Sequence, residues 1–367
     1  MVMETPLRAE HQELSAQFAT YFDCLLPERF TDTASECRLG RESVALLDTN
    51  YRSFIYLEGP DRVRYLNAML TNNIKDLGEG QGNVALLLNP QGHILAEPEC
   101  YALADRLLVV GHASVRQRTV EALDKFIIMD DVTLDDATDR LGAVAIEGPR
   151  AAAVVADLCG VDLEKVADRG HAAATVASLP CRIIRRSHFG EPGAEFIIER
   201  EKLLALWQAL LEAVRSRGGG PIGYAALNAL RLEAGIAWFG YDFDDKVIPH
   251  EAALETSHVS FTKGCYTGQE IVERVRSRGH VNRRRVGLQF SGTTLPSPGT
   301  TLLAGGKQVG HVSSAAFSPN LGRVLGMGYV RREHNSPGSS LEWAEGTAEV
   351  VELPLVGLKA ARSGQPS

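Results

Sequence analysis

The sequence predicts an α+β protein with two units of alternating strands and helices, followed by a small C-terminal β-barrel or sandwich. Its 367 residues, 44% hydrophobic and 23% charged, suit two or three globular domains. A strand–turn–helix pattern around Leu-Glu-Gly-Pro at 57–60 recurs as Ile-Glu-Gly-Pro at 146–149, which indicates an internal repeat. From residue 283 onward, short strands alternate with Gly, Pro and Ser turns.

Residues 1–42 are expected to form a helical lead-in, because apolar residues from Leu14 to Leu25 recur at helical spacing and Pro27 ends the pattern. The first α+β unit is expected over 43–140. Its predicted elements are a strand at 53–57, a helix carrying Val63, Leu66, Met69 and Leu70, strands at 84–88 and 94–102 joined by a turn at 89–92, a strand at 107–110 and a helix at 114–127.

The second α+β unit is expected over 141–280 and the barrel over 281–358, with a disordered tail at 359–367. The predicted helices of the second unit are 149–158, 201–217, 222–234 and about 267–278, and its strands are 143–146, 181–186 and 194–199. The predicted barrel strands are 285–290, 308–313, 323–330 and 348–353.

Composition and charge argue against a general nucleic-acid binder, a secreted protein and a membrane protein. A net charge of −8 argues against a general nucleic-acid binder, because such proteins carry a basic field that neutralises phosphates. The first thirty residues are acidic and lack an apolar stretch of signal-peptide length. Runs of about 18 apolar residues, which a membrane span needs, are absent from the sequence. A cytoplasmic protein without a membrane anchor is therefore expected.

Six cysteines lie 13 to 84 residues apart, without a C-x-x-C pair or a histidine at zinc-site spacing. A metal or cluster site made by this chain alone is therefore not expected. In a reducing compartment these cysteines are expected to be free thiols.

The segment 263–270 combines a lysine, two glycines and a cysteine directly before a predicted helix. The helix dipole and Lys263 would both favour the thiolate of Cys265, the reactive form of the side chain. The glycines would let a ligand approach the backbone. A tight turn that packs a small thiol is the alternative, and position alone does not decide between the two.

The complete pattern of this segment resembles the K-G-C-(F/Y)-x-G-Q-E motif of the YgfZ family of folate-binding proteins. The matching residues are Lys263, Gly264, Cys265, Tyr266, Gly268, Gln269 and Glu270. Other segments are similar to stretches that this family shares with the glycine-cleavage aminomethyltransferases, so that the resemblance runs from about 43 to 355. These segments are 190–195, 230–236, 240–242, 248–251, 317–319 and 328–330.

The resemblance implies a ring of split strand-helix, ferredoxin-like domains around a channel that binds tetrahydrofolate. It implies an accessory protein that supports assembly or repair of iron–sulfur enzymes, especially 4Fe–4S enzymes, with client enzymes or cluster-assembly proteins as partners. Cys265 and Lys263 would then be the reactive pair. Glu195 matches the carboxylate that binds the pterin, and Arg231 matches an arginine lining the folate site. A strand-face carboxylate and a salt-bridging helix residue are the alternatives for these two.

The same resemblance leaves a folate-dependent transferase as an alternative. An aminomethyltransferase needs an acid near the folate amine nitrogens, within a G-G-x-x-D-D type stretch. Here the stretch is 91–98, where Ala96 replaces the first acid and Glu97 is left to substitute. Transferases also carry an acidic and a bulky apolar residue where Cys265 and Tyr266 stand. Both departures favour the non-transferase branch, and whether the chain is an enzyme stays open.

Six arginines and His280 lie between residues 274 and 285 without an acidic residue among them. Such a patch suits the glutamate tail of a folate, the acidic surface of a partner, or RNA. The RNA interpretation makes the protein a folate-linked partner in tRNA modification. A solvated helix end is the alternative.

Overall fold

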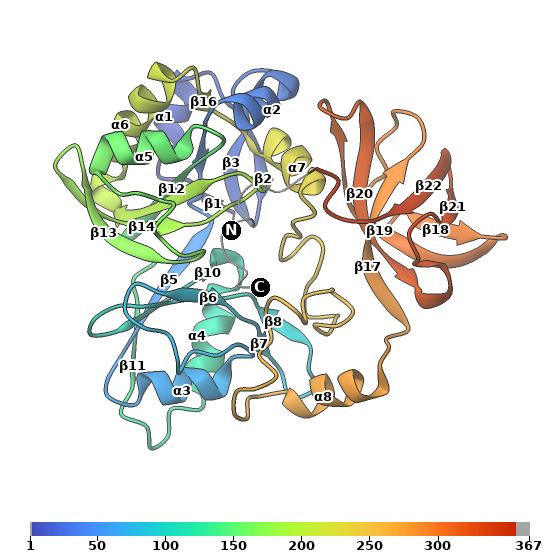
Figure 1. Cartoon of the computed structure of the whole chain (residues 1–367), viewed down its shortest axis with the longest axis horizontal. Coiled ribbons are helices and arrows are strands. Elements are labelled where there is room, and N and C mark those ends of the chain that lie inside the picture. The colour runs from blue at the N-terminus through green and yellow to red at the C-terminus, as the bar shows by residue number, and fades with distance from the viewer. Residues whose placement is uncertain (1, 357–367) are drawn as a thin grey trace.

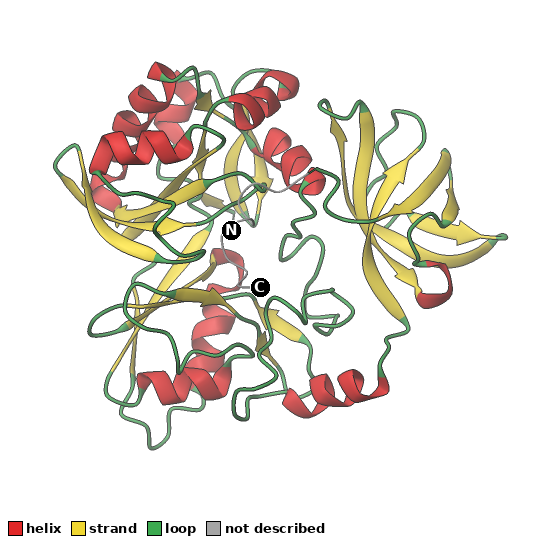
Figure 2. Ribbon diagram, in the orientation of Figure 1, coloured by secondary structure: helices red, strands yellow, loops and turns green. Residues whose placement is uncertain are grey.

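The computed structural model describes residues 2–356, in which two helix-covered sheets and a closed barrel surround a central segment (Figure 1). Most helices lie on the outside of this arrangement (Figure 2). The α+β class with a C-terminal barrel is thereby confirmed. The expected tail at 359–367 lies outside the described residues.

The N-terminal segment forms a hairpin where a continuous helical pattern was expected. Strands β2 (Gln17–Tyr21) and β3 (Cys24–Arg29) pair antiparallel, and β1 (Met3–Glu4) pairs with β3 in parallel. Helix α1 (Arg8–Glu13) precedes this hairpin, and α2 (Thr33–Glu42) follows it. Phe22 and Asp23 both have positive φ, +53° and +59°. Two consecutive residues of this kind make a tight hairpin turn, and they interrupt a helix. The helical expectation for this stretch is therefore wrong.

The first unit is a five-stranded sheet in the order β11-β5-β10-β9-β6. Helices α3 and α4 pack against one face, where residues such as Leu57, Leu66 and Leu123 are buried together. Its elements are β5 (Arg52–Glu58), α3 (Arg62–Met69), β6 (Gly82–Val84), β7 (Leu87–Leu88), β8 (Ile94–Ala96), β9 (Glu99–Ala102), β10 (Leu107–His112), η1 (Ala113–Val115), α4 (Arg116–Asp124) and β11 (Thr133–Asp136).

The strand expected at 94–102 is broken in two. Pro98 has no N–H to donate to a sheet, and Ala85 N donates to the Pro98 carbonyl across the break. β8 pairs only with β7, whereas β9 belongs to the main sheet. Glu97 therefore lies at the junction between two sheets.

The second unit is a six-stranded sheet in the order β13-β14-β15-β12-β4-β16, covered on one face by α5 and α6. Its elements are β4 (Ala45–Asp48), β12 (Leu141–Glu147), α5 (Ala151–Cys159), β13 (His171–Val176), β14 (Leu179–Arg185), β15 (Gly193–Glu199), η2 (Arg200–Lys202), α6 (Leu203–Ser216) and β16 (Gly220–Pro221). A third cluster, which includes Phe54, Val110 and Ile197, packs the two sheets against each other.

The repeated Glu-Gly-Pro turns have the same structural cause in both units. Gly59 and Gly148 lie at φ +98° and +142°, each three residues before the first residue of α3 or α5. A Cβ atom would lie 2.1 Å from the Asp131 carbonyl oxygen at Gly59 and 2.6 Å from the Ser43 carbonyl oxygen at Gly148. Both turns therefore require glycine.

The remaining chain forms α7 (Tyr224–Glu233), a central segment at 235–268, α8 (Gln269–Arg278) and the barrel. The barrel closes in the order β17-β20-β19-β18-β21-β22, so it is not a sandwich. Its elements are β17 (Arg283–Phe290), β18 (Thr301–Ala304), β19 (Lys307–Ser318), β20 (Arg323–Arg331), η3 (Arg332–His334), β21 (Ser340–Trp343) and β22 (Gly346–Val351). Within residues 2–356, the helices are all too short or too polar to cross a membrane.

Candidate functional site

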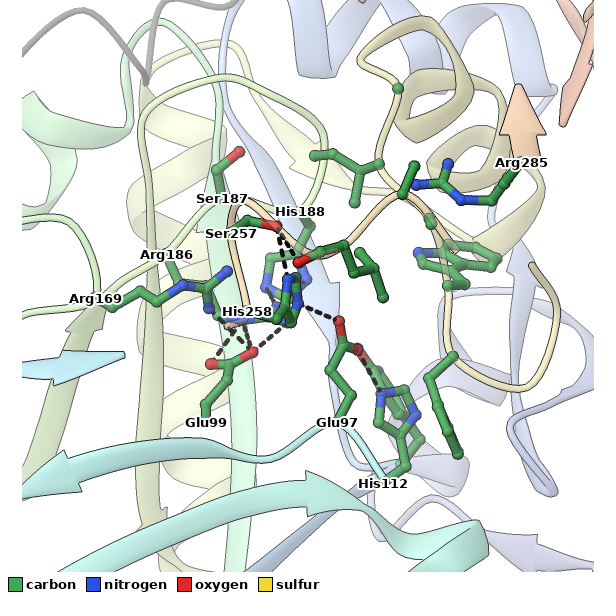
Figure 3. Close-up of a pocket in the computed structure, with 18 residues that line it drawn as sticks. Glu97, Glu99, His112, Arg169, Arg186, Ser187, His188, Ser257, His258 and Arg285 are labelled. Atoms are coloured by element: carbon green, nitrogen blue, oxygen red, sulfur yellow. Dashed lines mark hydrogen bonds and ion pairs between the residues drawn. The ribbon is translucent and has the colours of Figure 1, made fainter. Parts of the chain in front are cut away.

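A cavity of about 300 Å³ lies where the first sheet, the loop at 186–188, the central segment and the barrel meet (Figure 3). Its apolar lining includes the rings of Tyr51, Trp238 and Phe239. Its ionisable lining residues are Glu97, Glu99, His112, Arg169, Arg186, His188, His258 and Arg285. A lining of aromatic rings with convergent polar groups is typical of a small-molecule site.

Glu97 is the centre of a hydrogen-bonded array in this cavity. Its Oε1 atom lies 2.9 Å from His258 Nε2, and its Oε2 atom lies 4.0 Å from His112 Nε2. Figure 3 shows the carboxylate between the two rings. The Glu97 side chain keeps 19% of its surface exposed, so it is open to a molecule in the cavity.

The ionisation of this array follows from its surroundings. Burial raises the pKa of Glu97, but the hydrogen bond and proximity of His258 lower it more, so its pKa lies below the ordinary value. Burial lowers the pKa of His112 to about 4. At neutral pH the cavity therefore holds an ionised Glu97 beside a neutral His112.

Glu99 also lines the cavity, is more buried than Glu97, and forms ion pairs with three arginines. Its oxygens lie 2.8 Å from Arg186, 3.1 Å from Arg52 and 3.3 Å from Arg169. Burial raises the pKa of Glu99, but the three arginines outweigh it and hold the pKa well below the ordinary value. Glu99 is therefore committed to ion pairs, whereas Glu97 faces no arginine at ion-pair distance in the described chain.

Glu195, the expected pterin ligand, is fully buried in β15 behind Arg52. Arg52 Nη2 lies 3.4 Å from Glu195 Oε2, and it also contacts Glu99. Neither carboxylate oxygen of Glu195 has a hydrogen-bond partner in the described residues. A buried carboxylate without hydrogen bonds is costly, and the adjacent N–H donors of a pterin would satisfy it. Glu195 is therefore a buried acceptor suited to such donors, but it is not among the residues that line the cavity.

Arg231, expected to line the folate site, lies elsewhere. Its guanidinium is fully buried in α7, where it pairs with Asp242 and donates to the Ile236 carbonyl at 3.0 Å. Asp242 also accepts from Ser313 and Ser314 of β19, at 2.6 and 2.5 Å. Arg231 therefore ties α7 and the central segment to the barrel, and Arg285 is the barrel arginine that lines the cavity.

Lys263 and Cys265 are also outside the cavity. Lys263 Nζ donates to the carbonyls of Asn67, Leu70 and Asn72, the last at 3.1 Å, and thereby caps the C-terminal end of α3. Burial lowers its pKa to about 8. Cys265 is exposed. The ammonium group thus faces α3.

The rest of the 263–270 segment packs against the turn before β8. Gly268 has φ +82°, and a Cβ atom there would lie 2.7 Å from the Asn89 carbonyl oxygen. Tyr266 is buried with Leu88 and Ile94. The segment therefore supports the hairpin that leads to Glu97. Helix α8 starts at Gln269, two residues later than expected.

The arginine-rich stretch is largely neutralised by acids from other segments. Arg283 pairs with Glu251 at 3.1 Å, and Arg284 pairs with Glu255 at 2.8 Å. On α8 itself, Arg274 and Arg276 pair with Glu270 and Glu273. These acids lie outside residues 274–285, which is why the sequence stretch alone looked uncompensated.

The other five cysteines do not form a cluster site. In the part of the chain that the structure describes, all six are free thiols, and groups of three or more potential metal ligands are absent. Burial raises the pKa of Cys24 and Cys37 to about 12, which keeps them protonated.

Comparison with known proteins assigns both parts of this architecture to one family. Residues 7–263 match the GCVT N-terminal domain, and residues 283–356 match the glycine cleavage T-protein C-terminal barrel domain. The chain belongs to the glycine cleavage T-protein family. The narrower resemblance to YgfZ proteins stays an interpretation of the 263–270 segment.

Individual relatives agree along nearly the whole chain. The aminomethyltransferase of Streptomyces avermitilis is 31% identical over 360 residues, which cover 96% of each protein. That of Halothermothrix orenii is 29% identical over 359 residues, covering 96% of this chain and 99% of the relative. The crystal structure of glycine cleavage system aminomethyltransferase T from Bartonella henselae superposes with a TM-score of 0.89 at 26% identity, covering 98% and 99% of the two chains.

Most residues of the array and its surroundings were not singled out from the sequence, among them Arg52, His112, Ser257 and His258. They come from β5, from the end of β10 and from the central segment. Along the chain they carry no motif. Only the fold brings them to Glu97.

Proposed function

We propose that this member of the glycine cleavage T-protein family is a folate-dependent aminomethyl or related one-carbon transferase in which Glu97 is the catalytic carboxylate. The observation that carries the proposal is the position of Glu97: ionised, partly exposed and aimed into the cavity. Ala96 does not remove the acid from the site, because the break at Pro98 turns Glu97 toward the cavity.

The N–H donors of tetrahydrofolate suit the unpaired acceptor oxygens of Glu195, next to the cavity. Glu195 would hold the pterin, and the rings of Trp238 and Phe239 would cover its face. When bound, tetrahydrofolate supplies the amine nitrogens that accept a one-carbon unit. Glu97 is suited to accept a proton from such a nitrogen and to stabilise positive charge that develops beside it.

Calorimetry followed by a turnover assay tests this proposal. Tetrahydrofolate is expected to bind, and the protein is expected to form methylenetetrahydrofolate from a donor that carries an aminomethyl group. Tight binding without product from any aminomethyl or methyl-amine donor would contradict the transferase proposal. Absence of binding would contradict the folate site as well.

A second candidate is the accessory role in iron–sulfur enzyme maintenance, favoured by the exposed Cys265 within its motif. Because this thiol lies outside the cavity, it would act on the surface of a client enzyme or cluster-assembly protein, and one thiolate cannot hold a cluster alone. The activity of a 4Fe–4S enzyme in cells lacking the protein, complemented with Cys265→Ala, tests this role. Full rescue by the variant would exclude the thiol from the function.

The third candidate, a partner in tRNA modification, has less support. The paired arginines at 274, 276, 283 and 284 leave little uncompensated positive charge for a phosphate backbone. Salt-dependent tRNA binding that weakens when Arg283, Arg284 and Arg285 are neutralised would restore this candidate.

A further inference from the structure

We propose that His258 and Ser257 are positioning residues that hold Glu97 ionised and aimed into the cavity, a role that rests on the proposed transferase function. Ser257 Oγ lies 2.7 Å from His258 Nδ1, and His258 Nε2 lies 2.9 Å from Glu97 Oε1. All three side chains line the cavity, and Figure 3 shows them in a single hydrogen-bonded line.

An ionised Glu97 carboxylate can only accept, so the 2.9 Å hydrogen bond requires a proton on Nε2 of His258. In the neutral ring Nδ1 is then the acceptor, and the Ser257 hydroxyl, which also lies 3.4 Å from the Leu254 carbonyl, is placed to donate to it. A partner on the second ring nitrogen is how proteins set the tautomer and the orientation of a functional histidine. Ser257 therefore acts on Glu97 through the ring of His258.

The backbone under His258 is anchored independently of the cavity. Thr71, which is fully buried after α3, donates from its hydroxyl to the His258 carbonyl at 2.7 Å and accepts on its own carbonyl from Ser260 N at 3.0 Å. His258 N donates to the Leu254 carbonyl at 2.9 Å. These contacts hold the backbone that carries the ring before any ligand binds, as a preorganised site requires.

The second histidine beside Glu97 has a different environment. His112 lies farther away, at 4.0 Å, and its Nδ1 atom has no hydrogen-bond partner in the described residues. Its pKa of about 4 leaves it uncharged near neutral pH. Of the two histidines, His258 is therefore the one that forms a hydrogen bond with Glu97.

The other titratable and charged groups near Glu97 determine how its pKa would respond to the loss of His258. They are Glu99 of β9, His112 of β10 and Arg285 of β17. Burial of Glu97 favours its neutral form, and His258 supplies the largest opposing contribution. Without His258 the pKa of Glu97 is expected to rise, so that less of the ionised form is present at a given pH.

The test uses the full chain and reads the carboxylate directly. ¹³C NMR of labelled glutamate follows the titration of Glu97 without folate, in the wild type, His258→Leu, His258→Gln, Ser257→Ala and Ser257→Thr. The expected result is a higher Glu97 pKa in His258→Leu, a smaller rise in Ser257→Ala, and wild-type behaviour in Ser257→Thr. His258→Gln keeps an N–H donor near Glu97 but loses the ring contact with Ser257, so it should raise the Glu97 pKa less than His258→Leu. If His258→Leu does not fold, Ser257→Ala decides. An unchanged Glu97 titration in His258→Leu and Ser257→Ala would overturn the positioning role.

Kinetics provide the second readout. In His258→Leu, kcat is expected to fall about 10–100-fold with KM unchanged within about twofold, and the acid limb of the kcat–pH profile should move to higher pH. An equal loss at all pH values would reduce His258 to a structural residue. If the wild type turns over no donor, the proposed function fails, and the NMR titration still decides the positioning role by itself.

Discussion

The buried ion pair between Arg231 and Asp242 separates two roles for Arg231, a contact to folate and a structural tie. Both side chains are fully buried, and breaking such a pair by removing one partner costs about 3–5 kcal/mol. In Arg231→Met, Asp242 keeps its hydrogen bonds from Ser313, Ser314 and the Trp238 N–H. The expected loss of unfolding free energy is therefore at the lower end, about 3 kcal/mol.

Urea unfolding followed by circular dichroism measures this loss, and calorimetry measures tetrahydrofolate binding in the same variant. Arg118→Met is the matched control, because Arg118 pairs with Asp245 at the surface, where about 1 kcal/mol or less is expected. The Arg231→Met/Asp242→Asn double variant should lose less than the sum of the single losses. Arg231→Met with unchanged stability and abolished folate binding would refute the structural role.

Three further predictions follow from the site and its supports. Lys263→Met should lower the unfolding free energy by about 1–3 kcal/mol, because three backbone carbonyls lose their donor. The rate at which an alkylating reagent modifies Cys265 should change by less than about twofold, and an alkylation about tenfold slower would show that Lys263 activates the thiol. His112 has a folded pKa of about 4 against about 6.5 in an unfolded chain, so its stabilising contribution is present above pH 6.5 and is lost as the pH falls toward 4. Between pH 7 and 5 the wild type should therefore lose about 2 kcal/mol more than His112→Gln in urea unfolding, and equal losses would contradict the lowered pKa. Gly268→Ala should cost about 1–3 kcal/mol, because its backbone is left-handed and a Cβ would meet the Asn89 carbonyl; wild-type thermal stability would refute the close packing of the two turns.

Local patterns predicted the elements that they control. The strand at β5, the helix α3 and the long helix α6 follow from alternation and from an apolar face, which are properties of neighbouring residues. The hairpin at 17–29 was missed because its apolar spacing also fits a helix. The positive φ of Phe22 and Asp23 decides the structure there, and neither residue is a glycine that would have signalled a turn.

The sequence indicated site residues only where they belong to a short motif of neighbouring residues. The sequence drew attention to Glu97 only as the acid left where Ala96 departs from the motif, and its partner His258 lies 161 residues away and belongs to no motif. Lys263 shows the reverse error. It stands two residues from Cys265, yet its side chain caps α3, because burial and three carbonyl oxygens determine where the ammonium group points.

The most direct test of the central claim is tetrahydrofolate binding and one-carbon transfer by Glu97→Gln, with Glu121→Gln on the exposed face of α4 as control. Loss of the catalytic carboxylate should lower the transfer rate by about 10²–10⁴-fold, while Kd for tetrahydrofolate stays within about threefold and the control behaves as the wild type. A Glu97→Gln variant that binds tetrahydrofolate and transfers at the wild-type rate would contradict the assignment of Glu97 as the catalytic residue.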